Sequence, residues 1–208
     1  MNLLHIDSSA LGEASVSRQL TAAITAAWTQ SVPGLTIAYR DLAVAPPDHL
    51  SAELMQVVKL RNLDGLSDRQ RQELALTDAL VDEFLAADVV VIGAPMYNFS
   101  VPTQLKAWID RIAQVGRTFR YTEKGPEGLA GGKTVIIASS RGGIFSGNEA
   151  MQALDHQEAY LRTVLGFFGI TDLTVIRAEG VGMGPEARAK ALAAAQDQIG
   201  RLVPLAAE

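Results

Sequence analysis

The sequence predicts an α/β fold in which helices cover both faces of a doubly wound, five-stranded parallel sheet. Residues 89–92 form an unbroken β-branched run without polar alternation, as expected of a strand buried on both faces of a parallel sheet. Residues 133–139 form a second run of this kind. Segments with apolar residues at helical spacing separate the expected strands, and this alternation favours crossovers around one parallel sheet.

Each expected element has its own signal. Apolar patterns typical of strands occur at residues 2–7, 35–40, 89–92, 133–139 and 172–178. Helical spacing of apolar residues occurs at residues 18–30, 52–60, 68–86, from 102 onward, 148–168 and 185–203. Ser17 is expected to cap the first helix. Pro102 is expected to open the helix after the third strand, where its missing N–H costs nothing.

Two segments do not fit simple crossovers. Residues 41–66 are too long for one, and we interpret them as an excursion over the sheet edge or onto a partner chain. Residues 116–133 contain several glycines and are interpreted as a small flap or hairpin.

Composition excludes several classes of function. The 208 residues are 48% hydrophobic and 20% charged, which is typical of a globular chain, and we expect a single domain over residues 1–208. The net charge of −5 gives no basic footprint for nucleic acid or an anionic membrane surface. No apolar run approaches membrane-spanning length, and no signal-peptide pattern is visible. We therefore expect a cytoplasmic protein.

The chain has no cysteines. Disulfides, thiol nucleophiles and Cys-ligated metal sites are therefore excluded. His5 and His49 have no carboxylate at ligand spacing, so no metal site is expected. Any redox chemistry would need a bound organic cofactor.

The first strand leads into a serine-rich loop just before a helix. Its four serines are Ser8, Ser9, Ser15 and Ser17. Serine hydroxyls and the free N–H groups at a helix N-terminus can hold a phosphate. Helix capping alone explains one serine but not four, whereas Asp7 beside the loop disfavours an anion. Both interpretations stay open on spacing alone.

Two further loops are expected at the same carboxyl edge of the sheet, where open α/β sheets bind ligands. Residues 96–99, Met-Tyr-Asn-Phe, follow the third strand and offer apolar walls and an amide. Residues 140–143, Ser-Arg-Gly-Gly, follow the fourth strand, and their glycines would let backbone N–H groups approach a ligand. A tight turn is the simpler alternative for the glycine pair. Together the three loops suit a ligand with a phosphate tail and a planar polar ring, such as flavin mononucleotide (FMN) in the flavodoxin-like strand order.

Two other motifs are weak. Residues 182–187 match the G-x-G-x-x-A dinucleotide pattern, but no complete βαβ unit follows them. Ser146 lies near glycines but lacks the G-x-S-x-G spacing of a nucleophile elbow, and His156 is expected on a helix rather than after the last strand. A Ser-His-Asp hydrolase is therefore poorly supported.

Five runs carry a family resemblance, namely residues 94–99, 118–122, 125–129, 140–143 and 166–170. They resemble the FMN-dependent NADH-azoreductases, a family of flavodoxin-like NAD(P)H:quinone reductases. The similarity extends through essentially the whole chain.

The resemblance implies a flavodoxin-like fold, bound FMN, NADH as electron donor, and a quinone or azo compound as acceptor. It implies ping-pong turnover in which the flavin carries the chemistry and no side chain is catalytic in the strict sense. It also implies a homodimer whose sites are completed by the neighbouring chain. The cofactor-binding residues implied are Ser9, Ser15, Val16, Ser17, Met96, Tyr97, Asn98, Phe99, Ser140, Arg141, Gly142 and Gly143.

The substrate pocket implied by the resemblance comprises Phe99, Tyr121 and Val164. Val164 stands where relatives often carry a phenylalanine, so the pocket is expected to be wider or less aromatic. The main alternative is a flavodoxin-type FMN electron carrier that NADH does not reduce directly. A hydrolase using Ser146 and His156 is the second alternative.

Overall fold

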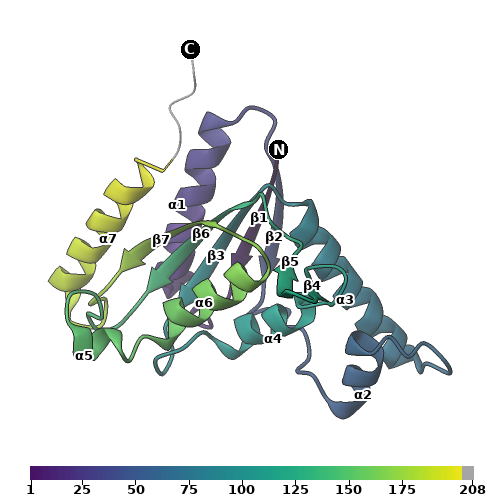
Figure 1. The fold of residues 1–208 in the computed structure, drawn as a ribbon. Coiled ribbons are helices and arrows are strands. Elements are labelled where there is room, and N and C mark those ends of the chain that lie inside the picture. The colour runs from purple at the N-terminus through teal and green to yellow at the C-terminus, as the bar shows by residue number, and fades with distance from the viewer. Residues whose placement is uncertain (203–208) are drawn as a thin grey trace.

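The computed structural model describes residues 1–202. Five parallel strands form one sheet in the order β2-β1-β3-β6-β7, and β4 and β5 form a separate antiparallel hairpin (Figure 1). The strands are β1 (Asn2–Asp7), β2 (Thr36–Asp41), β3 (Val89–Pro95), β4 (Phe119–Thr122), β5 (Gly125–Gly128), β6 (Thr134–Ser140) and β7 (Asp172–Ala178). The helices are α1 (Val16–Ser31), α2 (Ala52–Leu54), α3 (Asp68–Ala86), α4 (Thr103–Ile112), α5 (Glu149–Gln152), α6 (His156–Phe167) and α7 (Pro185–Ile199).

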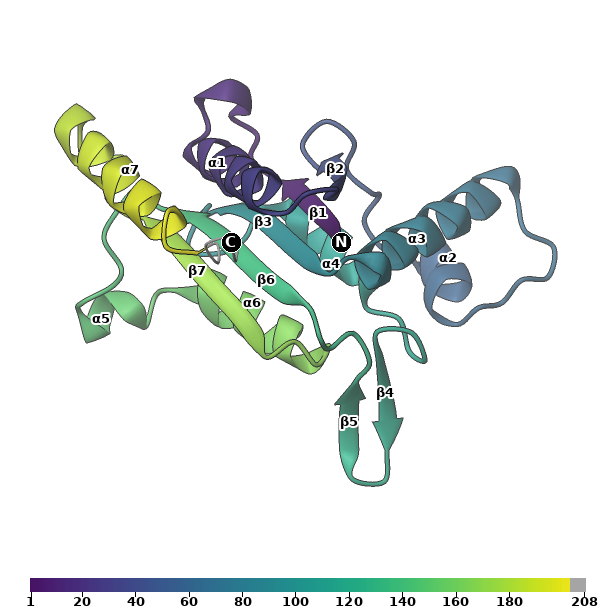
Figure 2. The ribbon, with the colours of Figure 1, turned by 90° about the horizontal axis from the view of Figure 1, so that it is seen from above.

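The predicted doubly wound, flavodoxin-like sheet is confirmed. Helices α1 and α7 cover one face, and α3, α4 and α6 cover the other (Figures 1 and 2). Along β3, Val89 and Val91 face α1 and α7, whereas Val90 and Ile92 face the other layer. Successive side chains of a strand point to opposite faces, so a strand covered on both sides must be apolar throughout. This is why the run at residues 89–92 shows no alternation.

The hairpin lies beyond the amino ends of the strands. It joins the end of α4 to the start of β6, and it projects away from the body of the molecule (Figure 2). Its base touches the turn after α6 so closely that a Cβ atom on Gly128 would lie 2.1 Å from the Gly169 nitrogen. A side chain at this position would therefore force the hairpin away from the turn. The hairpin expected at residues 116–133 is confirmed.

Several expected boundaries were wrong. The first helix begins at Val16, with Ser15 as its N-cap, so Ser17 lies inside its first turn. Pro102 is the N-cap of α4 rather than its first residue. The helix expected at 148–168 is two helices, because Asp155 caps a new one with its carboxylate.

The 41–66 segment forms little regular helix. Only Ala52–Leu54 are α-helical, and Met55–Lys59 continue as a π-helical turn rather than as the expected amphipathic helix. The expected last helix ends at Ile199, and its predicted end at residue 203 lies outside the described residues. Within residues 1–202, none of the helices is both long and apolar enough to cross a membrane.

Candidate functional site

The three predicted loops meet at the carboxyl edge of the sheet. The Ser8 hydroxyl donates to the carbonyl of Gly93 in β3 (2.6 Å). The Ser9 hydroxyl and the Tyr97 phenol share a hydrogen bond of 3.1 Å, and the N–H of Met96 donates to the Ser140 carbonyl (2.8 Å). Since strand order reverses between β1 and β3, this edge is the topological switch point at which open sheets bind ligands.

The first loop ends in a helix N-terminus lined with hydroxyls. The Ser15 hydroxyl accepts from the N–H of Arg18 (3.3 Å) and shares a hydrogen bond with the Ser17 hydroxyl (3.1 Å). Ser15, Val16 and Ser17 are all buried. The first N–H groups of an α-helix have no intrahelical partner and carry the positive end of its dipole. This end of α1 can therefore hold a phosphate.

Asp7 does not offer a free carboxylate to this loop, because its oxygens are already bound within the chain. Its carboxylate accepts from Thr21 (2.8 Å) and Tyr39 (3.1 Å), and the Arg18 guanidinium lies 3.6 Å away. Burial raises the pKa of Asp7, but the His5 imidazole 3.4 Å away and the hydrogen bonds from Thr21 and Tyr39 outweigh this effect, and its pKa lies below the ordinary value. Asp7 is therefore ionised and fully partnered.

Arg18 ties the first loop to the end of β2. Its guanidinium donates to both carboxylate oxygens of Asp41 (2.6 and 2.7 Å) and to the backbone carbonyl of Ser9 (3.1 Å). Arg18 was not among the site residues expected from the sequence, because an arginine in the first turn of a helix gives no signal of its distant partners.

The second loop is a strained turn. Asn98 and Phe99 have φ angles of +48° and +69°, and Tyr97 and Ser100 exchange backbone hydrogen bonds across them (2.9 and 3.1 Å). Left-handed backbone is uncommon for Asn and a genuine outlier for Phe, and such strain gathers at functional sites. The turn leaves Phe99 47% exposed, with its ring edge-on to Phe145 at 6.3 Å. It presents an aromatic face at the sheet edge.

The third loop exposes backbone. Gly142 is exposed, and a Cβ atom built on it would meet nothing within 4 Å. The carbonyls of Gly142 and Gly143 accept from the N–H groups of Gly182 (3.0 Å) and Gly180 (2.9 Å), so the loop is held by the β7–α7 connection. The open side of Gly142 is where a planar ligand can approach the main chain.

Arg141 points the other way, into the protein. Its side chain is 1% exposed and forms ion pairs with Asp155 (2.9 Å), Glu179 (3.2 Å) and Glu158. Its backbone N–H donates to the Ala178 carbonyl (2.9 Å). The structure therefore gives Arg141 a role in holding the loop rather than a free group for a ligand. Asp155 followed by Glu158 three residues later is a helix-start signal that the sequence analysis overlooked.

The three expected substrate-pocket residues do not lie together in one chain. Phe99 is at the carboxyl edge, whereas Tyr121 is on the hairpin beyond the amino ends of the strands and is 71% exposed (Figure 2). Val164 lies near the end of α6, half-buried against the core.

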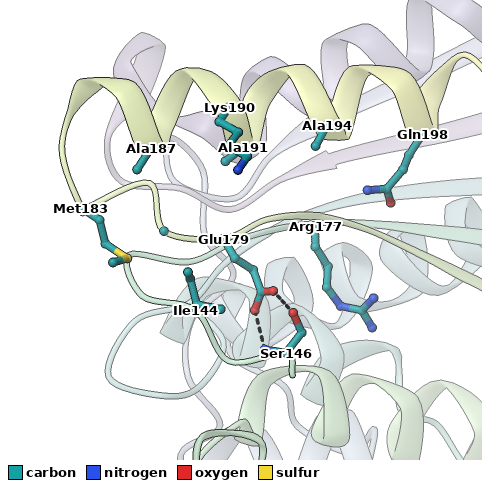
Figure 3. Close-up of a pocket in the computed structure, with 11 residues that line it drawn as sticks. Ile144, Ser146, Arg177, Glu179, Met183, Ala187, Lys190, Ala191, Ala194 and Gln198 are labelled. Carbon is teal, nitrogen blue, oxygen red and sulfur yellow. Dashed lines mark hydrogen bonds between the residues drawn. The ribbon is translucent and has the colours of Figure 1, made fainter. Parts of the chain in front are cut away.

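A cleft of about 540 Å³ lies beside the third loop, between β7 and α7. Figure 3 shows Ile144 and Met183 at one end and a row of alanines from α7 along it. Its charged groups on the β7 side are already paired, because Arg177 binds both carboxylate oxygens of Glu158 (2.7 Å each) and Glu179 accepts from Ser146. We therefore keep the carboxyl edge, and not this cleft, as the candidate site.

The hydrogen bonding of Ser146 argues against the hydrolase alternative. The Ser146 hydroxyl is hydrogen-bonded to the Glu179 carboxylate (Figure 3). Within residues 1–202, no hydrogen bond joins Ser146 to His156, which is exposed at the start of α6. A serine bound to a carboxylate and not to an imidazole lacks the base that a nucleophile needs.

Comparison with known proteins identifies the family. A family profile described as a flavodoxin-like fold matches residues 1–203. The FMN-dependent NADH:quinone oxidoreductase of Azospirillum brasilense is 76% identical over 208 residues, which is the whole of both chains. The chain belongs to the family of the FMN-dependent NADH:quinone oxidoreductases.

A second relative and a solved structure support this family assignment. The FMN-dependent NADH:quinone oxidoreductase of Polaromonas naphthalenivorans (strain CJ2) is 59% identical over 197 residues, covering 95% of this chain and 91% of its own. The crystal structure of the azoreductase from Bacillus anthracis str. Sterne superposes with a TM-score of 0.87 at 26% identity, covering 97% of this chain and 98% of its own.

Proposed function

We propose that this chain is an FMN-dependent NADH:quinone oxidoreductase that transfers two electrons by a ping-pong mechanism. The observation that carries the proposal is the meeting of a hydroxyl-lined helix N-terminus, a strained aromatic turn and an open glycine backbone at one sheet edge. The relative of the same name at 76% identity supports it.

The residues present fit FMN. Ser9, together with Ser15, Val16 and Ser17 at the start of α1, would hold the phosphate. Residues 96–99 would line the ring system, and residues 140–143 would bind its pyrimidine edge. The space beside Gly142, which a Cβ atom would fill, suits a flat ring against the backbone. Arg141 would contribute by fixing this loop from inside the protein.

FMN held by these residues would supply the hydride and two-electron chemistry, which no side chain of the chain provides. The chain's own residues would bind and orient the flavin and shield it from solvent. The carboxylates nearest the first loop are partnered, so they leave the positive end of α1 free for the phosphate. The exposed Phe99 ring offers an apolar surface for a planar substrate. No side chain need act as a nucleophile.

We further propose that aromatic azo compounds serve as acceptors besides quinones. The support is the likeness to the Bacillus anthracis azoreductase at 26% identity. Both classes are planar, conjugated two-electron acceptors, and a site bordered by an aromatic ring and open backbone does not distinguish them by shape.

We also propose a homodimer in which the partner's hairpin completes the site. The support is that Phe99 and Tyr121 lie at opposite ends of one chain although both are exposed aromatics. The molar mass measured by light scattering during size-exclusion chromatography tests whether the protein is a dimer. Tyr121→Ala should then raise KM for the quinone, while FMN stays bound. A monodisperse monomer with full activity would contradict the proposal.

The decisive experiment is an anaerobic half-reaction. The FMN-loaded protein is mixed with NADH and then with a benzoquinone, and the visible spectrum is followed. The flavin absorbance should be bleached by NADH and should recover when quinone is added. In the steady state, plots of reciprocal rate against reciprocal NADH concentration at several quinone concentrations should be parallel. Bound flavin that NADH does not bleach would instead indicate an electron carrier.

A further inference from the structure

The first turn of α6 contacts two of the three loops from inside the protein. Gln157 is fully buried. Its side-chain N–H donates to the carbonyl of Ala94 (2.6 Å), and its side-chain oxygen accepts from the Ser139 hydroxyl (2.9 Å). One residue earlier, the backbone N–H of His156 donates to the Phe99 carbonyl (3.1 Å).

Ala94 and Ser139 are register partners in neighbouring strands, and they lie at the bases of the two loops. β1 ends opposite Gly93, so past this point β3 has lost its neighbour on that side. A strand end with one neighbour is held by fewer backbone hydrogen bonds. The Gln157 amide supplies the missing support because it offers both a donor for the carbonyl and an acceptor for the hydroxyl.

The contact continues into the third loop. Ser139 also accepts from the guanidinium of Arg141 (3.1 Å), whose other nitrogens pair with carboxylates at the start of α6 and in the β7–α7 connection. Gln157 therefore stands at the centre of a buried chain of hydrogen bonds from residue 94 to residue 141. Such networks fix geometry more strongly than isolated pairs do.

We propose that Gln157 is a positioning residue that sets the spacing between the residue 96–99 loop and the residue 140–143 loop, and thereby the affinity for FMN. The inference rests on the proposed function, because it concerns the same site. Gln157 touches neither the exposed turn nor the open glycine, and it acts through the strand ends that carry them.

Gln157→Met tests this inference, because methionine has a similar length and is a good helix former but makes neither hydrogen bond. Thr77→Val is the matched control. Thr77 on α3 is also fully buried and makes two side-chain hydrogen bonds, to the Glu73 carbonyl (2.9 Å) and from Arg111 (2.8 Å), away from the three loops. Thermal unfolding, FMN affinity by fluorescence quenching, and amide hydrogen exchange without flavin are measured for both variants.

We expect Gln157→Met to weaken FMN binding about tenfold, which corresponds to about 1.4 kcal/mol. It should also speed hydrogen exchange at the amides of residues 96–100 in the flavin-free protein. Thr77→Val should lower the unfolding temperature to a similar degree. Its FMN affinity and its hydrogen exchange at residues 96–100 should stay at the wild-type values. If Gln157→Met does not fold, Ser139→Ala replaces it, with the same expected direction.

The inference is overturned if Gln157→Met binds FMN as tightly as wild type, or if Thr77→Val weakens binding equally, since the effect would then be general destabilisation. These outcomes differ from failure of the proposed function. If wild-type protein binds no FMN, the proposed function and the inference fail together, whereas flavin that binds without bleaching by NADH removes only the enzyme assignment.

Discussion

Replacing Arg141 by methionine tests whether the third loop is held from inside the protein. The side chain is 1% exposed and faces Asp155, Glu158 and Glu179. Removing one partner of a buried ion pair costs about 3–5 kcal/mol, because it leaves charge buried without compensation. Here Glu158 keeps Arg177 (2.7 Å) and Glu179 keeps the N–H of Phe145 (2.9 Å). We therefore expect Arg141→Met to lower the free energy of unfolding by an amount at the lower end of this range, about 3 kcal/mol.

The assay is urea denaturation of the flavin-free protein at pH 7. Arg120→Met is the control, because the Arg120–Glu127 pair on the hairpin is 56% and 49% exposed and exposed pairs contribute about 0–1 kcal/mol. A loss below about 1 kcal/mol for Arg141→Met, together with loss of FMN binding, would refute the reasoning. It would mean that the guanidinium contacts the ligand and not the network.

Three other changes test FMN binding at the third loop and stability around the first loop. Gly142→Ala should leave the unfolding temperature unchanged, since a Cβ atom there meets nothing within 4 Å, but it should weaken FMN binding measured by fluorescence titration. Ser15→Ala removes the N-cap of α1 and should cost about 1 kcal/mol in urea denaturation. The Arg18 guanidinium holds the pKa of Asp41 below its ordinary value. The ionised Asp41 carboxylate therefore stabilises the folded state above its unfolded pKa of about 3.9, and this stabilisation is lost as pH falls through the folded pKa. The difference in unfolding free energy between wild type and Asp41→Asn, about 2 kcal/mol at pH 7, should accordingly narrow under acid, as urea titrations at pH 7 and pH 3 would show.

The strands and the meeting of the loops at the candidate site could be predicted because both follow from local patterns. Burial on both faces leaves the apolar run at residues 89–92 without alternation. The carboxyl ends of parallel strands share one edge, so the loops at residues 96–99 and 140–143 had to come close once the strands were recognised.

The supporting contacts could not be predicted, because their partners are distant in sequence. Nothing local distinguishes Gln157, buried at the start of α6, from a solvent-facing glutamine. Arg141 sits between two glycines and a serine, and its three carboxylates come from two other segments. Ser15 and Ser17 are equally good caps by residue type, whereas in the structure Ser15 is the cap and Val16 after it packs into the core.

The most direct test of the central claim compares FMN with riboflavin, which lacks the phosphate, in titrations of the flavin-free protein. If the phosphate lies at the hydroxyl-lined start of α1 and the ring lies across the other two loops, both ligands bind and FMN binds at least tenfold more tightly, roughly the worth of one charge-assisted hydrogen bond. Equal affinities for the two, or no binding of either, would contradict this account of the carboxyl edge.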